Sequence, residues 1–309
     1  MVIKMKYLEE YIRYLTYEKH YSSYTVVNYE SDILEFIDYL NKEQIELLEI
    51  DYTLIRNYLG YLFDEKKGNN TTVSRKISSL RGFYKYLSNH EYIKSNPFRL
   101  VSLPKKTKTL PKYFYYNELE ELFNSCDTKT PLGQRDELIL ELLYATGVRV
   151  SELVNIKLKD INEFDFTIKI LGKGNKERLV SFGEYAKDAL DLYKRDGRDK
   201  LNVKNSDYLF LNHIGGVLTT RGVRDILDRI IKRTTIDKNI SPHMLRHTFA
   251  THLINEGCDL LAVSELLGHE SLAATQIYTH VTMDHLKEVY FHAHPRAYIK
   301  DNKGDKNEK

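Results

Sequence analysis

Residues 104–112 divide this chain of 309 residues into two parts. The segment contains two prolines, Pro104 and Pro111, and four lysines, but almost no apolar side chains. Such a composition is typical of an extended, solvated linker, because it offers nothing to bury in a core. We therefore expect two domains, residues 1–103 and 113–299, joined by this linker and followed by a polar, disordered tail over residues 300–309.

The overall composition is that of a globular protein with little net charge. Hydrophobic residues make up 42% of the chain, which is enough for sizeable cores. Lys and Arg total 46 against 44 Asp and Glu, so the formal net charge is +2 and any nucleic-acid surface must be a local patch. The two cysteines, Cys126 and Cys258, form neither a disulfide framework nor a CxxC pair. With no signal peptide and no membrane-length apolar run, we expect a cytoplasmic protein.

The first domain is expected to be helical. Apolar residues at helical spacing predict helices over residues 6–18, 23–41 and 52–63. A fourth helix is expected to begin at a cap on Thr71 or Thr72. Its apolar stripe consists of Val73, Ile77, Leu80, Phe83 and Leu87, and its opposite face carries Arg75, Lys76, Ser79 and Lys85. We interpret Arg75, Lys76 and Lys85 as DNA-backbone contacts, the alternative being an ordinary solvated face.

The linker supplies a second set of candidate DNA contacts, namely Lys105, Lys106 and Lys108. A basic linker between two lobes can close a clamp around a duplex. The alternative is a flexible tether whose lysines only keep it solvated.

The second domain is expected to be mainly α-helical with one hairpin. Asn117, three residues before Glu120, is a plausible helix cap. Residues 164–170 and 178–182 have strand character, and the turn between them contains Lys173. Further helices are predicted over residues 220–233, 243–256, 260–267, 272–277 and 284–293. Gly257 and Gly268 are placed to end two of these helices.

The densest cluster of chemical groups lies between residues 241 and 253, at the start of a predicted helix. With Ser241 as cap and Pro242 at the first helical position, His243 and Arg246 share a face near the helix N-terminus. That end of a helix attracts phosphate. His243 and His247 also have the spacing of a zinc-protease helix, but Met244 stands where such a site needs a glutamate.

Several short motifs, in a fixed order, carry a resemblance to a known family. They are ATGVRVSEL around Arg149, the turn GKGNKER around Lys173, HMLRHTFATHL from His243, LLGH ending at His269, and TQIYTHV around Tyr278. Together they resemble the catalytic domain of the tyrosine recombinase, or phage integrase, family. Residues 1–103 also look like the helical core-binding, SAM-like domain of that family. The resemblance implies a mainly α fold with a small β-sheet or hairpin in the catalytic domain, arranged as a C-shaped DNA clamp.

The resemblance also implies roles for six residues. Arg149 and Arg246 would bind the scissile phosphate, and Tyr278 would be the nucleophile that forms a 3'-phosphotyrosyl bond. His243 and His269 would serve phosphate binding and proton transfer, and Lys173 would be the general acid. Two guanidiniums can neutralise charge in the transition state, and a tyrosine with an ordinary pKa of about 10 needs a nearby base, for which we choose His243. Glu152, one turn after Arg149, is expected to orient a guanidinium.

Neither a cofactor nor a metal is expected. The sequence has no GxxxxGK[ST] phosphate loop and no carboxylates spaced for two metals. Since phosphotyrosyl and phosphodiester bonds are both phosphate diesters, rejoining the DNA requires no ATP.

Within the family the chain is most similar to the Xer subgroup. This likeness implies double-stranded DNA with a dif-like site, a homo- or hetero-tetramer with a second Xer-type recombinase, and a septal DNA translocase of the FtsK kind in chromosome dimer resolution and segregation. It also implies that the final helix, residues 284–293, docks on a neighbouring subunit, the alternative being that it packs on its own domain. An integrase of a phage, plasmid or transposon and a catalytically silent DNA-binding protein remain the alternative functions.

Overall fold

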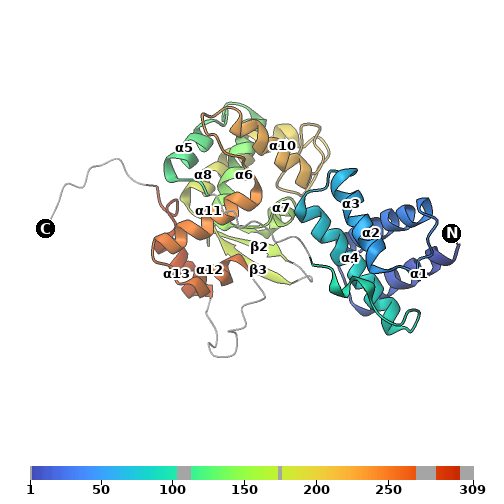
Figure 1. Cartoon of the computed structure of the whole chain (residues 1–309). Coiled ribbons are helices and arrows are strands. Elements are labelled where there is room, and N and C mark those ends of the chain that lie inside the picture. The colour runs from blue at the N-terminus through green and yellow to red at the C-terminus, as the bar shows by residue number, and fades with distance from the viewer. Residues whose placement is uncertain (1, 103–112, 173–175, 269–282, 300–309) are drawn as a thin grey trace. The chain divides into compact units, whose positions relative to one another are not determined.

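The computed structural model describes residues 2–102, 113–172, 176–268 and 283–299. The chain divides into two compact units, residues 1–109 and 110–309, and the boundary falls within the segment predicted to be a linker. Both units are built mainly from helices (Figure 1). Within the described ranges, no helix is long and apolar enough to cross a membrane.

The first unit is a helical bundle. Its helices are α1 (Val2–Arg13), α2 (Ser23–Lys42), α3 (Tyr52–Asp64) and α4 (Asn70–Asn89), with a π-helical turn at Tyr14–Glu18 and a 3-10 turn at Pro97–Leu100. The apolar stripe predicted for α4 is confirmed, because all five of its residues are fully buried. They pack against α2, whose Phe36 meets Tyr58 of α3 edge to face with ring centroids 4.7 Å apart.

Two predicted helix caps are wrong by about two residues. The N-cap of α4 is Asn69, whose Oδ1 accepts a hydrogen bond from the Thr72 amide at 2.8 Å. In the second unit, α5 is capped at Tyr115, where the Glu118 carboxylate accepts from the Tyr115 amide at 2.8 Å. At α4, Asn69 is as good a cap former as Thr71 or Thr72, so only the backbone path distinguishes them. At α5 the cap is a tyrosine, which cap preferences would not have selected over Asn117.

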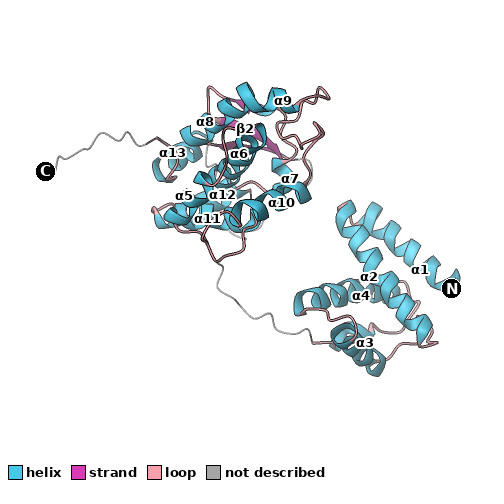
Figure 2. Ribbon diagram, turned by 90° about the horizontal axis from the view of Figure 1, so that it is seen from above, coloured by secondary structure: helices cyan, strands magenta, loops and turns pink. Residues whose placement is uncertain are grey.

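The second unit surrounds a central buried helix, α6. Its helices are α5 (Tyr116–Asn124), α6 (Pro131–Thr146), α7 (Val150–Leu153), α8 (Glu184–Leu192), α9 (Asp199–Leu201), α10 (Thr220–Ile231), α11 (Pro242–Asn255), α12 (Leu260–Leu267) and α13 (Met283–Ala293). Helix α6 contacts α5, α7, α8 and α11, and Figure 2 shows it enclosed among them. Thirteen of its residues are buried, which explains why its sequence has no polar face.

A three-stranded antiparallel sheet lies at one side of this unit. Its strands are β1 (Ile161–Asn162), β2 (Thr167–Leu171) and β3 (Glu177–Ser181), in the order β1-β2-β3. The predicted hairpin is confirmed, with Ile168 opposite Val180, but β2 begins three residues later than expected. Phe164, expected to start that strand, is 92% exposed and lies before it. The register places Arg178 and Val180 on one face of β3.

Candidate active site

Arg149 lies at the N-terminal end of the short helix α7 and is held by Glu152. The Arg149 backbone amide donates to Glu152 Oε2 at 2.9 Å, and Arg149 Nη1 donates to Glu152 Oε1 at 3.0 Å. The expectation that Glu152 orients a guanidinium is therefore confirmed. The Glu152 side chain is only 4% exposed, whereas that of Arg149 is 44% exposed, so one end of Arg149 is fixed and the rest reaches the surface.

A second arginine, Arg178 on β3, binds the same carboxylate. Its Nη1 donates to Glu152 Oε1 at 2.9 Å and its Nη2 donates to Oε2 at 2.8 Å. This is a two-pronged arginine–carboxylate pair, the strongest geometry such a pair adopts. Sequence reasoning missed Arg178. A usable signal was its place two residues before the buried Val180, because an arginine on the inner face of a strand requires an acidic partner.

Arg246 is buried in the middle of the site. It lies on α11, where the predicted cap is confirmed because Ser241 Oγ accepts from the Met244 amide at 3.1 Å. Its Nη1 donates to the carbonyl of Gly147 at the end of α6, and its Nη2 donates to the carbonyl of Leu267 at 2.7 Å. Three helices thus fix this guanidinium, two of them by their C-terminal carbonyls.

The charges of these arginines affect one another. Burial, together with the positive charges of Arg149 and Arg178, lowers the pKa of Arg246 to about 10, although Glu152 opposes this shift. Arg246 therefore still carries its proton at neutral pH. Burial alone would raise the pKa of Glu152, but hydrogen bonds from Arg178 and Arg149 outweigh it and lower that pKa below its ordinary value. Three cations and one anion share the site, which makes it a place for a phosphate.

His243 is exposed near the start of α11, one turn before Arg246. His247, one turn after His243, is half-buried, and burial together with the neighbouring His243 lowers its pKa. The structure thus brings Arg149, at the start of α7, close to Arg246 on α11, and places His243 one turn before Arg246 on the same helix. Lys173, His269 and Tyr278 lie outside the described residues.

The described residues next to two of those positions lie against Arg178. A Cβ added to Gly172, which precedes Lys173, would lie 3.4 Å from Arg178 Nη1. A Cβ added to Gly268, which precedes His269, would lie 2.9 Å from Arg178 Nε. Gly268 ends α12 in the left-handed conformation, as predicted. The Arg178 side chain is therefore adjacent to both glycines as well as to Glu152.

The predicted DNA contacts of α4 lie partly in ion pairs. Arg75 binds the buried carboxylate of Asp32, and Lys76 binds Glu35. Ser79, expected on the exposed face, is instead fully buried and donates to Asp32 at 2.7 Å. Lys85 is exposed. Lys105, Lys106 and Lys108 lie outside the described residues, so the DNA contacts stay predictions.

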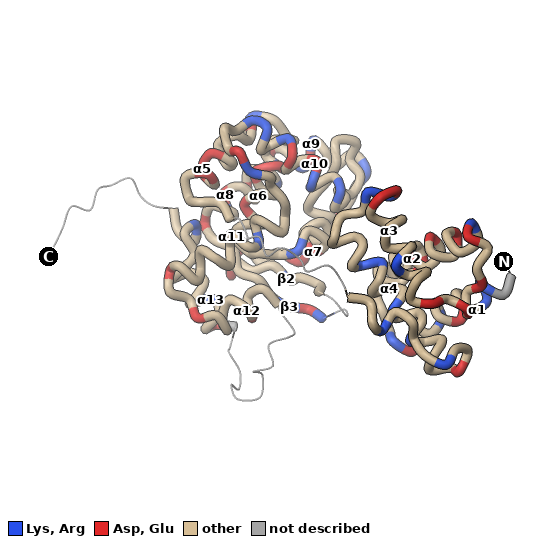
Figure 3. The backbone as a smooth tube through the Cα atoms, in the orientation of Figure 1, with Lys and Arg blue, Asp and Glu red and all other residues tan. Residues whose placement is uncertain are grey.

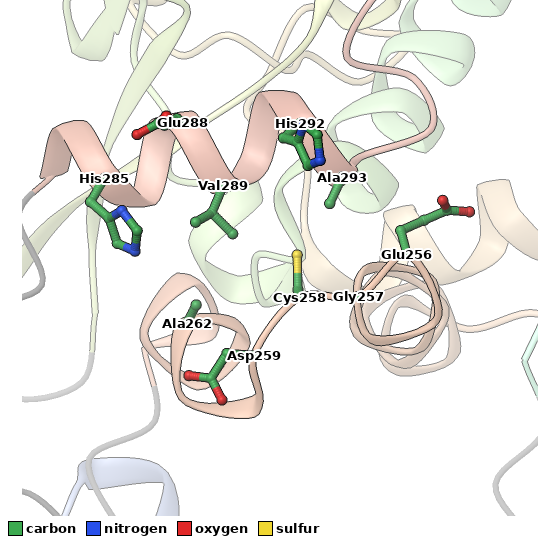
Figure 4. Close-up of a pocket in the computed structure, with 10 residues that line it drawn as sticks. All are labelled: Glu256, Gly257, Cys258, Asp259, Ala262, His285, Glu288, Val289, His292 and Ala293. Carbon is green, nitrogen blue, oxygen red and sulfur yellow. The ribbon is translucent and has the colours of Figure 1, made fainter. Parts of the chain in front are cut away.

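A separate hollow of about 500 Å³ lies between α12 and α13 (Figure 4). Its lining includes Glu256, Cys258, Asp259, His285, Glu288 and His292. None of the described site residues lines this hollow. Helix α13 itself packs on its own domain, with Leu286, Tyr290 and Ala293 buried, which is the alternative that the sequence left open.

Two family models together match most of the chain. A model described as the phage integrase family matches residues 112–285, and one described as the phage integrase N-terminal SAM-like domain matches residues 8–91. A tyrosine recombinase XerC from Anoxybacillus flavithermus is 51% identical over 294 residues, which is 94% of this chain and 98% of the relative. One from Bacillus subtilis is 47% identical over 299 residues, covering 96% and 98%.

Solved structures of recombinases have a fold similar to that of this chain. The XerH site-specific recombinase bound to a palindromic difH substrate, in a post-cleavage complex, is 28% identical, with a TM-score of 0.67 over 86% of this chain and 79% of that one. A lambda integrase dimer bound to a core site, at 18% identity and a TM-score of 0.64, supports the fold alone. The expected likeness to the Xer recombinases is confirmed, and the relatives from Anoxybacillus flavithermus and Bacillus subtilis are both XerC proteins. The chain belongs to the phage integrase family and is a tyrosine site-specific recombinase.

Proposed function

We propose that this recombinase cuts DNA by attack of Tyr278 on the scissile phosphate, in a site built around Arg149 and Arg246. The juxtaposition of these two arginines, one buried and one half-exposed, carries the proposal. Their guanidiniums bind the non-bridging oxygens and neutralise the charge that grows as the phosphorus becomes five-coordinate. Because Arg246 is fixed by two backbone carbonyls, it needs little rearrangement when the phosphate arrives.

The proton transfers are assigned to the remaining residues. His243 accepts the proton of the Tyr278 hydroxyl as its oxygen forms a bond to phosphorus. The bond from phosphorus to the 5'-oxygen then breaks, and Lys173 gives that oxygen a proton, leaving a 3'-phosphotyrosyl bond and a free 5'-hydroxyl. His269 donates a further hydrogen bond to the phosphate. Attack by a 5'-hydroxyl of another strand reverses these steps and rejoins the DNA without ATP.

The biological role follows the relatives. We infer that the chain acts in the cytoplasm at a dif-like site, in a tetramer of one or two Xer-type recombinases, to resolve chromosome dimers before cell division. Residues 1–103 bind DNA as the core-binding domain, residues 113–299 catalyse, and residues 104–112 join them into a clamp. A septal DNA translocase of the FtsK kind would activate the reaction.

A suicide DNA substrate tests the nucleophile. The protein is incubated, without metal or ATP, with a dif-like duplex nicked so that the cleaved strand diffuses away, and the products are separated in SDS. We expect a covalent protein–DNA adduct with the wild type and none with Tyr278→Phe, which should bind the duplex equally well. DNA binding without any adduct, even with the partner recombinase present, would instead support a catalytically silent DNA-binding protein.

A further inference from the structure

The carboxylate of Glu152 accepts four hydrogen bonds from two arginines. Oε1 accepts from Arg178 Nη1 at 2.9 Å and from Arg149 Nη1 at 3.0 Å. Oε2 accepts from Arg178 Nη2 at 2.8 Å and from the Arg149 amide at 2.9 Å. The Arg178 side chain is 19% exposed and its Nε is buried without a hydrogen-bond partner among the described residues. Arg178 is thus the arginine whose fork is fully directed at Glu152, whereas Arg149 uses one side-chain nitrogen.

The way the two arginines bind Glu152 determines which of them is neutralised by its carboxylate. If Arg149 were the single arginine partner of the buried Glu152 carboxylate, the two would form an ion pair. Glu152 would then neutralise the charge of Arg149, and that charge would not be available to DNA. With Arg178 present, the carboxylate is already neutralised in a two-pronged pair. Arg149 remains oriented by Glu152, while its other guanidinium nitrogens make no hydrogen bond within the described part of the chain. Its positive charge is therefore available to a phosphate.

Arg178 also contacts the backbone on two other sides. Its guanidinium lies against Gly172 at the end of β2 and against Gly268 at the end of α12. A Cβ on Gly268 would lie 2.9 Å from Nε and 3.2 Å from Cζ, closer than such contacts normally allow. The flat guanidinium therefore fills a space that the glycine leaves open. A lysine would keep the charge but neither the fork nor this flat contact.

We propose that Arg178 is a positioning residue of the recombination reaction, which neutralises Glu152 so that Arg149 keeps its charge for the scissile phosphate. The inference rests on the proposed function, because it requires Arg149 to bind that phosphate. Arg178 acts through Glu152 and, by its contacts with Gly172 and Gly268, holds two neighbouring backbone segments at the same place.

The test uses a set of variants of the full chain. Arg178→Met removes the fork but keeps much of its volume, and Glu152→Gln removes the charge that the fork neutralises. The double variant Arg178→Met/Glu152→Gln has no unpaired buried carboxylate and should fold even where the single variant is unstable. Arg178→Lys keeps the charge alone. Arg195→Met, which removes an exposed arginine paired with Asp196 in the same unit, is the matched control.

Each variant is assayed for adduct formation at saturating protein, for DNA affinity and for thermal melting. We expect Arg178→Met to slow adduct formation by about 100-fold, the usual cost of losing one oriented charge in such a site. Its affinity should change only a few-fold. The double variant should recover much of the rate, Arg178→Lys should fall between wild type and Arg178→Met, and Arg195→Met should match wild type.

A second substrate separates electrostatics from structure. A duplex with a neutral methylphosphonate at the scissile position lacks one negative charge. On that substrate, Arg178→Met should therefore slow adduct formation several-fold less than it does on the phosphate substrate. The inference would be overturned if Arg178→Met formed the adduct at the wild-type rate. It would also be overturned if Arg178→Met lost the same rate on both substrates and the double variant recovered none of that rate. The proposed function fails in a different way, since the wild type would then form no adduct that depends on Tyr278.

Discussion

At the scale of single residues, one glycine decides how closely a buried arginine of the site can approach the backbone. Gly147 ends α6 with a φ of +59°, and its carbonyl accepts a hydrogen bond from Arg246. A Cβ at this position would lie 2.6 Å from Phe249 Cδ1 and 2.9 Å from Leu267 Cδ2. Both its backbone conformation and its packing therefore exclude a side chain.

Gly147→Ala should destabilise the second unit and reduce adduct formation. Left-handed backbone alone costs about 1–2 kcal/mol for a non-glycine residue. Gly257→Ala is the matched control, because Gly257 also has a positive φ, +88°, but nothing lies within 4 Å of its added Cβ. The overlap with Phe249 should make Gly147→Ala costlier by about a further 1–3 kcal/mol in urea denaturation. Equal losses in the two variants would show that the overlap is relieved without cost.

The sequence predicted the roles of Arg149 and Arg246, which stand in recognisable strings, but not the role of Arg178, although Arg178 ends the GKGNKER string. Arg149 and Arg246 stood in motifs, and Glu152 was close enough to Arg149 along the helix for its role to be foreseen. Arg178 lies 26 residues beyond Glu152, on a strand. Their pairing depends on the hairpin returning to α7, and no local pattern specifies that contact.

At the scale of elements, the segment after α13 completes the second unit. Arg296 binds Glu141 of α6, and its guanidinium lies 4.1 Å from the Phe123 ring centroid and 3.8 Å from that of Tyr185. His294 is buried beside Tyr144 and accepts a hydrogen bond from the Arg296 amide at 3.2 Å. The apolar spacing of α13 indicated its buried face, but it did not determine whether that face packs on its own domain.

Acid should weaken this anchor through His294. Burial lowers the pKa of His294 to about 3, whereas in the unfolded chain it is near its ordinary 6.5. As the pH falls, His294 therefore binds a proton in the unfolded state before it does so in the folded state. The contribution of the neutral histidine to the free energy of unfolding is complete above pH 6.5 and is lost as the pH falls toward 3. Glu141, whose pKa burial raises to about 7, acts in the opposite direction between its ordinary 4.5 and 7.

His294→Asn isolates the histidine, because an asparagine oxygen can still accept from the Arg296 amide. Between pH 6 and pH 4, the free energy of unfolding should fall more steeply in the wild type than in the variant, by up to about 1.4 kcal/mol per pH unit. Urea denaturation across that range measures the difference. Parallel curves for the two proteins would mean that His294 titrates normally in the folded state.

At the scale of the whole molecule, DNA binding has to come from local arrangements of charge. The net charge is only +2, and basic and acidic residues are interspersed along both units (Figure 3). On α4, the buried carboxylate of Asp32 already binds Arg75, and Lys76 is shared between Asp32 and Glu35. The basic face read from the sequence is thus less positive than its lysines and arginines suggest, because their partners lie on another helix.

Salt titration of duplex binding should distinguish these residues. Each phosphate contact contributes about one unit to the slope of log affinity against log salt concentration. If the α4 face contacts DNA, Lys85→Ala should reduce that slope by about one, and Arg75→Ala by clearly less, since Arg75 is already neutralised. Glu184→Ala, which changes a charge in the other unit, serves as the reference. A larger effect of Arg75→Ala than of Lys85→Ala would show that Arg75 leaves Asp32 to bind DNA.

The contact of Arg296 with Glu141 also orders events during synthesis of the chain. Residues 1–109 can form their core as soon as they leave the ribosome, because every helix of that unit lies within them. The second unit cannot complete its core so early, because that core includes Tyr290 and Ala297. In addition, α6 carries the Glu141 carboxylate, which is 2% exposed and whose arginine comes 155 residues later. Until that arginine emerges, the nascent domain has to keep Glu141 in water or protonated. The second unit is therefore the last to mature.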